Sequence, residues 1–414
     1  MRYYIDNLVY FPYKKNPVFR KKINYLLKFI KQFDDLPGQG TQRWLDQRKK
    51  TIGGSEIGTL IGDNPYQDIK DLIKTKLGWS EFRGNIHTYW GKVFEPNVQR
   101  FLEILFRCKI YETGSLPGCI EGTSYSPDGF AVTLSENIER LIRMGYIEEH
   151  DYPKDALTIL FEIKSPSRRK PIKGKIPHHY ISQPLSGLCH FPFIDLAYFV
   201  DVTFRIAPID YMSEAFFNEY NNKYHKDRYP YDYPLAMGVM GIFEKDPDHR
   251  ELNLGRLVDD LVDFGDTDAR LFEKMIYLAS VNKLHIEYFD PIPRYEVNNA
   301  VYEQSIEYKI SQSINCMDYI ADKNDYLPIG YLPYKIYNFN IVPLQRQENF
   351  MKEIEPLIKQ FLNTLEIIKA APNPKDKFDE IFGCAKKAKP VVDSSSYIPP
   401  TSEFADEFDS DDDF

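Results

Sequence analysis

The chain has 414 residues, 43% of them hydrophobic and 15% aromatic, a composition that favours a large folded core over a disordered chain. It has no run of about 18 apolar residues, and the first fifteen residues lack the apolar stretch of a secretory signal, so neither a membrane span nor secretion is expected. Seven acids of the last twelve residues account for most of the net charge of −9, so the rest of the chain is nearly neutral and a nucleic-acid partner is not excluded.

The cysteines are scattered without close pairing (Cys108, Cys119, Cys189, Cys316 and Cys384). This pattern favours a reducing compartment and disfavours a zinc or iron–sulfur site. A cytosolic protein is therefore expected.

The chain divides by composition into three parts. Residues 1–40 are predicted to form an N-terminal helical extension, because apolar residues recur at helical spacing from Asn16 to Phe33. Residues 41–370 are predicted to form an elaborated α/β domain, with a charged, peripheral insertion at 135–155 and a C-terminal part at 208–370. Residues 371–414, rich in Pro, Ser and finally acids, are predicted to be a disordered tail.

Within the C-terminal half, patterning predicts further elements with ordinary structural roles. They are a strand at 194–204 with Asp195 and Asp201 at its ends, a strand at 234–243, an amphipathic helix at 254–278, one or two strands at 327–343, and a closing helix at 350–368.

Two N-terminal segments carry candidate binding residues. A predicted helix places Trp44 and Arg48 on one face and leads into Gly53-Gly54-Ser55, where Ser55 suits a helix N-cap whose free amides attract phosphate. A capped helix–turn–helix is the purely structural alternative. Glu95 lies near the start of a helix predicted from Tyr89, either as an acid that complements the helix dipole or as an outer metal ligand.

The central stretch is an apolar, β-branched run that ends in Glu162-Ile163-Lys164 and is predicted to be a buried strand. Alternation places Glu162 and Lys164 on one face, and charges in a buried strand must be paired or bind a metal. Asp128, in Ser126-Pro127-Asp128-Gly129, supplies a second acid, although Asp-Gly alone is typical of a turn. Oxygen ligands without thiolate suit Mg²⁺ or Mn²⁺.

A basic loop follows this strand. Six positive charges occur with no acid between them, at Lys164, Arg168, Arg169, Lys170, Lys173 and Lys175. Beside a metal site, such a loop is predicted to contact phosphate rather than merely to solubilise the protein.

These motifs, in this order, resemble the YqaJ-type viral recombinases, the lambda-exonuclease-like branch of the PD-(D/E)xK nuclease superfamily. The likeness is strongest to versions in large nucleocytoplasmic DNA viruses. It covers residues 42–206 with specific motifs and extends more loosely to residue 370. The motifs are Trp44…Arg48…Gly53-Gly54-Ser55-Glu56, Phe94-Glu95-Pro96, Ser126-Pro127-Asp128-Gly129, Glu162-Ile163-Lys164-Ser165-Pro166 and Tyr180…Gln183.

The resemblance implies a PD-(D/E)xK core, with a mixed central sheet flanked by helices, and a 5′→3′ exonuclease that acts on duplex DNA with two Mg²⁺ ions. It also implies a ring-shaped homotrimer, a single-strand annealing partner, and action at a viral replication site in the host cytoplasm or packaging in the virion. Asp128 would bridge the ions, Glu162 and the Ile163 carbonyl would hold one, Glu95 would support the site, and Lys164 would orient or deprotonate the attacking water. Arg48 and Ser55 would bind the 5′-phosphate, with Ser126, Gln183, Arg168 and Arg169 as further DNA contacts.

One departure concerns the family's Tyr-x-x-Gln-x-Gln motif, because Leu185 stands in place of the second Gln. Either Gln183 substitutes for it or the contact is absent. Pro184 is expected to interrupt the helix there.

Two alternatives remain open from the sequence. One is a structure-specific endonuclease on the same fold. The other is a non-catalytic virion protein that binds DNA or host factors, against which the intact Asp128, Glu162 and Lys164 argue.

Overall fold

A computed structural model describes residues 16–36, 41–80, 84–167, 169–206, 236–245, 276–280, 283–293 and 299–383. The predicted helix at 254–278 lies outside these ranges except for residues 276–278, which are helical. The acidic end of the tail also lies outside them.

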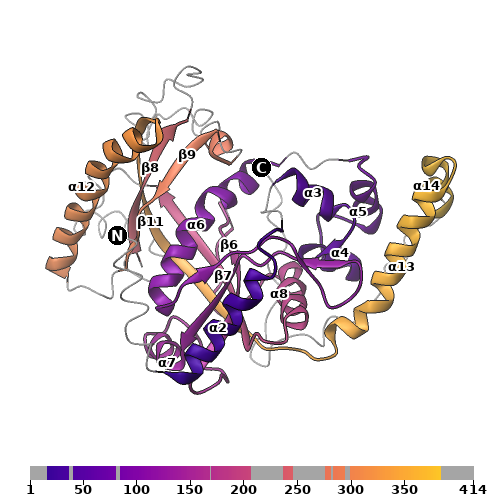
Figure 1. The fold of residues 1–414 in the computed structure, drawn as a ribbon, viewed down its shortest axis with the longest axis horizontal. Helices are drawn as coiled ribbons and strands as arrows, with labels where there is room; N and C mark the ends of the chain where they lie inside the picture. Colours follow the sequence, from indigo (N-terminus) through magenta and orange to yellow (C-terminus); the bar gives the residue numbers. More distant parts are fainter. Residues whose placement is uncertain are drawn as a thin grey trace.

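An eight-stranded mixed sheet forms the centre of the molecule (Figure 1). Its strand order is β10-β8-β11-β7-β6-β5-β2, and β9 is also paired to β8. Of these pairs, β6 and β7 run parallel and the others antiparallel. The strands are β2 (Ile110–Tyr111), β5 (Gly129–Leu134), β6 (Ala156–Lys164), β7 (Leu196–Ile206), β8 (Ala236–Glu244), β9 (Leu284–Tyr288), β10 (Ile292–Pro293) and β11 (Leu327–Leu344).

Helices cover both faces of this sheet because side chains alternate along its strands. Leu157, Ile159 and Phe161 of β6 pack in a core with α6 (Ile86–Phe106) and α7 (Ser135–Arg143). Leu160 packs on the opposite side with α2 (Pro17–Lys31), α4 (Ile57–Ile61), α8 (His178–His190) and α13 (Phe350–Ala370). Glu162 and Lys164 share the face of Leu160, the side of α8.

The remaining elements surround this layered body. A small sheet in the order β1-β4-β3 carries the turn that precedes α4. Its strands are β1 (Ile52–Gly53), β3 (Leu116–Pro117) and β4 (Thr123–Tyr125); the other helices are α3 (Gln42–Arg48), the 3₁₀ helix η2 (Gly54–Glu56), α5 (Ile69–Lys76), α12 (Asn299–Asn324) and α14 (Pro374–Phe382). Helices α13 and α14 extend away from the sheet, opposite α12 (Figure 1).

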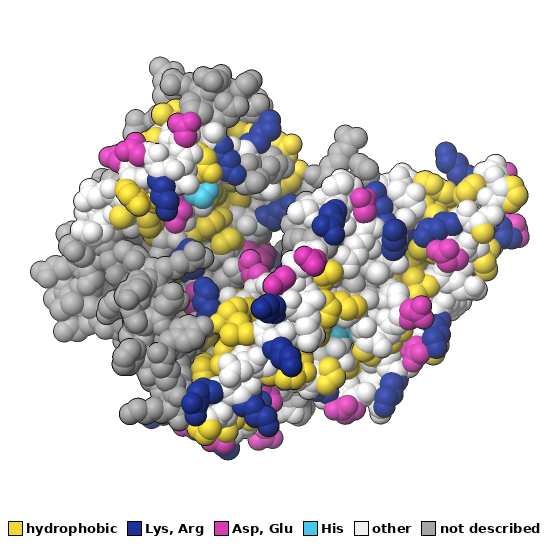
Figure 2. Space-filling view, viewed as in Figure 1, with side chains coloured by type: hydrophobic (Ala, Val, Ile, Leu, Met, Phe, Trp, Pro, Cys, Tyr) yellow, Lys and Arg dark blue, Asp and Glu magenta, His cyan; other side chains and the backbone are white. Residues whose placement is uncertain are grey.

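The predicted fold class, a mixed central sheet flanked by helices, is confirmed, and so is the burial of β6, of which every residue before Lys164 is buried. No helix in the described part of the chain is long and apolar enough to cross a membrane. Positive and negative side chains are interspersed over the face drawn in Figure 2, in keeping with a nearly neutral body.

Two predicted segments differ from expectation. The segment 135–155 is not peripheral, because α7 is amphipathic and buries Ile138 and Leu141 in the core shared with α6. The predicted disordered tail begins instead with α14, whose N-cap Asn373 accepts a hydrogen bond from the Lys375 amide and whose Phe378 is buried.

Two residue-level predictions were wrong. Asp201 lies inside β7 rather than at its end. Helix α8 continues through Pro184, which lacks the amide that would bond back to Tyr180. Pro184 and the apolar side chains Leu185 and Leu188 are buried, and this packing offsets the lost bond.

The end of α8 gives a pH-dependent contribution to stability. His190 is buried, its Nδ1 accepts a hydrogen bond from the Cys119 amide at 2.9 Å, and burial lowers the pKa of His190 to about 4. Because the unfolded imidazole titrates near 6.5, this contribution is fully present above pH 6.5 and is lost as the pH falls toward 4.

We expect the loss from this residue to reach about 2 kcal/mol by pH 5. His190→Asn places an amide oxygen near the Nδ1 position and cannot titrate, so the urea unfolding free energy of the variant should fall less between pH 7.5 and pH 5. An equal fall in both proteins would contradict the assignment.

Candidate active site

Asp128, Glu162 and Lys164 meet at the end of β6 beside the start of β5. The Lys164 ammonium bonds to Glu162 Oε1, lies 3.1 Å from the Ile163 carbonyl oxygen and 3.8 Å from Asp128 Oδ2. Asp128 Oδ2 in turn accepts the Ile163 amide at 2.7 Å. The residues predicted from the sequence to form the centre therefore lie in contact.

Buried Tyr125 holds Glu162 from the other side. Its hydroxyl donates to Glu162 Oε2 at 3.0 Å. The ring fits because Gly54 and Gly187 lack side chains, since a Cβ at either position would lie within 2.7 Å of ring atoms. Tyr125 thus links the Gly53-Gly54-Ser55 turn and α8 to the central carboxylate.

Burial and crowding oppose ionisation of the two acids. Burial, with repulsion from Asp128, raises the pKa of Glu162 to about 7 despite the nearby Lys164. Burial also raises the pKa of Asp128, although Lys164 and the Ile163 amide favour its charged form. Burial lowers the pKa of Lys164, but Glu162 and Asp128 more than offset this and raise it overall. Lys164 is thus held as a cation, which suits orientation of a water better than its deprotonation in this state.

Glu95 approaches from α6. The pKa of Glu95 is raised by burial and by the negative charges of Asp128, Glu112 and Glu162, with Lys164 acting in the opposite direction. Gln99, one turn later, donates to the Asp128 carbonyl oxygen at 2.9 Å and to Glu112 Oε1 at 2.6 Å. The first turns of α6 therefore carry an acid that senses the centre and an amide that fixes the Asp128 backbone.

The oxygens of this centre fit a cation. Within the described ranges, no three His, Cys, Asp or Glu side chains are grouped so as to hold a metal ion by themselves. However, the ammonium of Lys164 already lies among a Glu162 oxygen, the Ile163 carbonyl and Asp128. Hard oxygen donors of this type suit Mg²⁺ or Mn²⁺.

Arg48 and Ser55 form a second polar cluster next to Glu56. One Arg48 nitrogen, Nη2, donates to Ser55 Oγ at 3.1 Å and lies 3.0 Å from Glu56 Oε1. Burial raises the pKa of Glu56, but Arg48 and Lys76 more than offset this and lower it overall. The guanidinium thus contacts both its predicted pocket partner, Ser55, and the acid of the competing interpretation.

Lys76 anchors this cluster from below. Its buried ammonium bonds to Glu56 Oε2 and to the backbone oxygens of Arg48 and Thr51, each at 2.6 Å. Ser55 is not a helix N-cap as predicted, because it lies inside η2, whose N-cap is Gly53. The Gly53 amide bonds to Glu56 Oε2 instead.

The remaining predicted site residues are placed unevenly. Ser126 accepts from Trp44 Nε1 at 3.2 Å and so joins the Arg48 helix to the Asp128 turn. Gln183 is half-buried in α8, while Leu185 is buried in the core and cannot contact a phosphate. Arg169 pairs with Asp201, and its guanidinium lies 5.7 Å from the Tyr180 ring. Arg168 lies outside the described residues.

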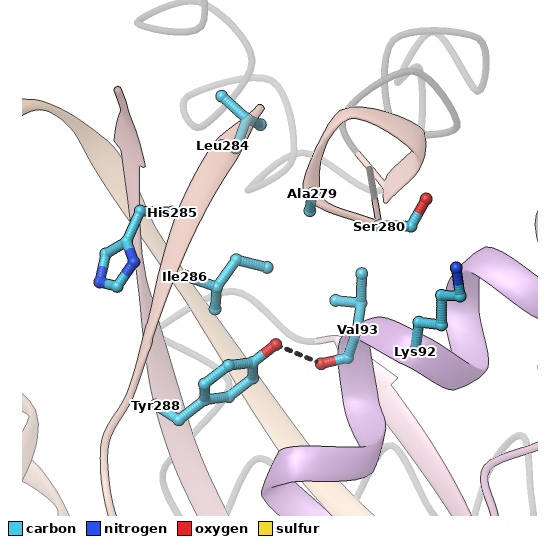
Figure 3. A pocket seen from close by; sticks show the side chains of 8 residues that line it. All are labelled: Lys92, Val93, Ala279, Ser280, Leu284, His285, Ile286 and Tyr288. Carbon is cyan, nitrogen blue, oxygen red and sulfur yellow. Dashed lines mark hydrogen bonds between the residues drawn. The ribbon is translucent and has the colours of Figure 1, made fainter. Parts of the chain in front are cut away.

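A pocket of 180 Å³ lies near the centre, between α6 and β9. It is lined by Lys92, Val93 and residues of 279–288, and the Tyr288 hydroxyl donates to the Val93 carbonyl at 2.8 Å (Figure 3). It begins within one turn of Glu95, yet none of the predicted site residues lines it.

Sequence reasoning missed Tyr125, Lys76, Gln99 and Asp201. Tyr125 directly precedes Ser126-Pro127-Asp128, and its place beside that motif was a usable signal. The other three are long-range partners that local pattern does not identify.

Tyr125 gives a test of the electrostatics. Its hydrogen bond lowers the pKa of Glu162, so Tyr125→Phe should raise it further and require a higher pH before Glu162 ionises. We expect the acidic limb of the pH–rate profile to move up by about one unit, the effect of losing one hydrogen bond to a charged group. A lower rate at every pH with an unmoved limb would show that Tyr125 is merely structural.

With this geometry in view, comparison with known proteins identifies the domain. Residues 43–188 match the YqaJ-like viral recombinase domain. The chain contains a YqaJ-like viral recombinase domain. This confirms the resemblance predicted from the motifs, and the matched range contains every predicted site residue.

Relatives and solved structures extend the comparison. The chain is 27% identical over 383 residues to a protein of African swine fever virus (strain Badajoz 1971 Vero-adapted), covering 89% of this chain and 98% of that protein. It is 26% identical over 372 residues to the protein of the same name from isolate Tick/Malawi/Lil 20-1/1983, covering 87% and 95%. An alkaline exonuclease, LHK-Exo, from Laribacter hongkongensis is similar at 19% identity and a TM-score of 0.28, over 39% of this chain and 74% of that one. The same enzyme in complex with dAMP gives the same identity and TM-score.

Proposed function

We propose that the protein is a metal-dependent 5′→3′ exonuclease that hydrolyses duplex DNA from its ends. The observation that carries this proposal is the convergence of Asp128 Oδ2, Glu162 Oε1 and the Ile163 carbonyl on the ammonium of Lys164. These are the oxygens and the cation that the PD-(D/E)xK pattern requires, and they lie in a domain of the recombinase family.

Asp128, Glu162 and the Ile163 carbonyl would hold the ions, two Mg²⁺ or Mn²⁺, with Glu95 in support. Such ions supply charge stabilisation for the attacked phosphate and lower the pKa of a bound water. The buried acids with raised pKa values are ready to exchange protons or Lys164 for metal cations.

Lys164 would orient the water that attacks phosphorus, because its ammonium is fixed by Glu162 and by the Ile163 carbonyl. Tyr125 would keep Glu162 in place while the bond to the leaving 3′-oxygen breaks. The side chain and backbone of one strand end thus position both the metals and the nucleophile.

Attack from an end requires recognition of that end. Arg48 and Ser55 would contact the terminal 5′-phosphate, and the bond of Trp44 to Ser126 ties their helix to the turn that carries Asp128. An endonuclease on the same fold would not need this cluster.

Linear and closed circular duplexes, each with Mg²⁺ or a chelator, test the function. We expect Mg²⁺-dependent loss of the linear duplex and an intact circle. Cutting of the circle would identify an endonuclease, and no cleavage of either substrate would leave a DNA-binding protein.

From the family alone we also propose a ring-shaped homotrimer, a single-strand annealing partner, and action in recombination, replication or processing of viral DNA in the host cytoplasm. The relatives are viral proteins, which supports a viral setting. Sedimentation of the full chain tests the oligomer, where a monomer at working concentration would exclude the ring.

A further inference from the structure

The face of the sheet that carries Glu162 and Lys164 continues as a polar strip across β7 and β11. Lys164 is paired in register with Asp201, and Asp201 with Asn340. The next pair on the same face is Thr203 with Asn338. Directly paired residues share a face, so these side chains lie beside one another.

Side chains of this strip are buried and bind the backbone of the basic loop between β6 and α8. Asn340 Oδ1 accepts the Gly174 amide at 2.8 Å, and its Nδ2 donates to the Lys175 carbonyl at 2.6 Å. Asn338 Nδ2 donates to the Pro171 carbonyl at 3.1 Å. Asn340 is 2% exposed and Asn338 is 5% exposed, so each would be costly without these bonds.

Asp201 holds the same loop through a side chain. It is fully buried and pairs with Arg169. The Arg169 guanidinium and the Lys164 ammonium both lie near the Tyr180 ring, at 5.7 Å and 5.4 Å from its centroid. The loop is thereby held against the same ring as the central lysine.

The shape of the loop does not depend on its own lysines. Lys170 and Lys173 are exposed, whereas the contacts that fix the loop are made by backbone groups and by Arg169. Gly174 adopts φ +74°, a conformation that L side chains rarely adopt, and a Cβ there would lie 2.7 Å from Glu148 Oε1. The result is a fixed backbone that presents positive charges to solvent.

We propose that Asn338, Asn340 and Asp201 form a latch that holds the basic loop as a preshaped surface for the phosphate backbone of duplex DNA. This inference rests on the proposed function and deepens it. Both asparagines lie on β11, outside the residues that match the family. The C-terminal part of the chain therefore positions a DNA-binding element of the nuclease domain.

Asn340→Ala tests the latch in the full chain. We expect faster trypsin cleavage after Arg169, Lys173 and Lys175, because the loop loses two backbone contacts. We expect the KM for linear duplex to rise about tenfold, the effect of weakened positioning worth one charge-assisted contact. The value of kcat should stay within about twofold of wild type, because the contacts of Glu162 and Lys164 with each other are unchanged.

Asn137→Ala is the matched control. Asn137 is equally buried, at 2%, and bonds to Thr133 Oγ1 at 3.0 Å, but it lies in α7 away from the loop. It should change neither cleavage of the loop nor KM. Gly174→Ala is a second variant that strains the loop from within should Asn340→Ala fail to fold.

The outcomes separate the inference from the proposed function. Loosening of the loop with an unchanged KM would overturn its role in DNA binding, and unchanged trypsin cleavage would overturn the latch. If the wild type cleaves no DNA, the proposed function fails, while the dissociation constant of duplex DNA still tests the latch through the same variants.

Discussion

Replacing Glu162 by Gln is expected to lower Mg²⁺-dependent cleavage of linear duplex by at least about a thousandfold, because metal-assisted stabilisation is worth several kcal/mol. The amide keeps the size of the side chain and the contact with Tyr125 but removes the charge that holds an ion. Single-turnover cleavage by the purified variant measures the effect. Substantial Mg²⁺-dependent activity in that variant would remove the central assignment.

The same substitution should spare the fold. The pKa of Glu162 is raised to about 7, above its ordinary value of 4.5, so its ionisation lowers stability as pH rises through this window. Without metal at pH 8, the Tm of Glu162→Gln should equal or exceed that of wild type. Glu103→Gln is the matched control, because Glu103 is also buried and paired with a lysine, Lys109, at 2.5 Å, yet it lies in the last turn of α6. It should leave cleavage unchanged.

Arg48→Ala is expected to erase most of a preference for 5′-phosphorylated over 5′-hydroxyl duplex ends. A guanidinium can bind two oxygens of a terminal phosphate, and two charge-assisted bonds are worth about 3 kcal/mol, roughly a hundredfold in rate. Glu56 and Ser55 both engage Nη2, which leaves the other guanidinium nitrogens for the phosphate. The ratio of digestion rates on the two kinds of end is the measurement.

Two variants distinguish a phosphate contact from a structural ion pair. Arg48→Lys keeps the charge but not the fork, so it should restore little of the preference. Gly53→Ala leaves Arg48 in place but introduces a Cβ 2.9 Å from its Nη2, which should displace the guanidinium and reduce the preference. If Arg48 serves only Glu56, all three proteins will digest both ends at the wild-type ratio.

The centre of the site was predictable because its residues are close in sequence or fixed by strand alternation. Glu162, Ile163 and Lys164 are consecutive, and the pairing of β5 with β6 brings Asp128 to the Ile163 amide. The layered fold followed from the apolar runs of β6 and β7 and from the amphipathic pattern of α2, α6 and α13.

What could not be predicted depends on distant partners. Asn340 meets Gly174 across 166 positions of sequence, and Lys76 reaches Glu56 through a fold that local pattern does not define. Pro184 and α7 failed for another reason, since tertiary burial outweighed a local preference. Polarity and metal use stay predictions.

The most direct measurement is Mg²⁺-initiated digestion of a linear duplex labelled at either the 5′ or the 3′ ends, beside a closed circle of the same sequence. We expect mononucleotides to be released from the 5′ ends, the 3′ label to remain on long products, and the circle to stay intact. Release of the 3′ label first, cutting of the circle, or equal digestion in chelator would contradict a metal-dependent 5′→3′ exonuclease at Asp128, Glu162 and Lys164.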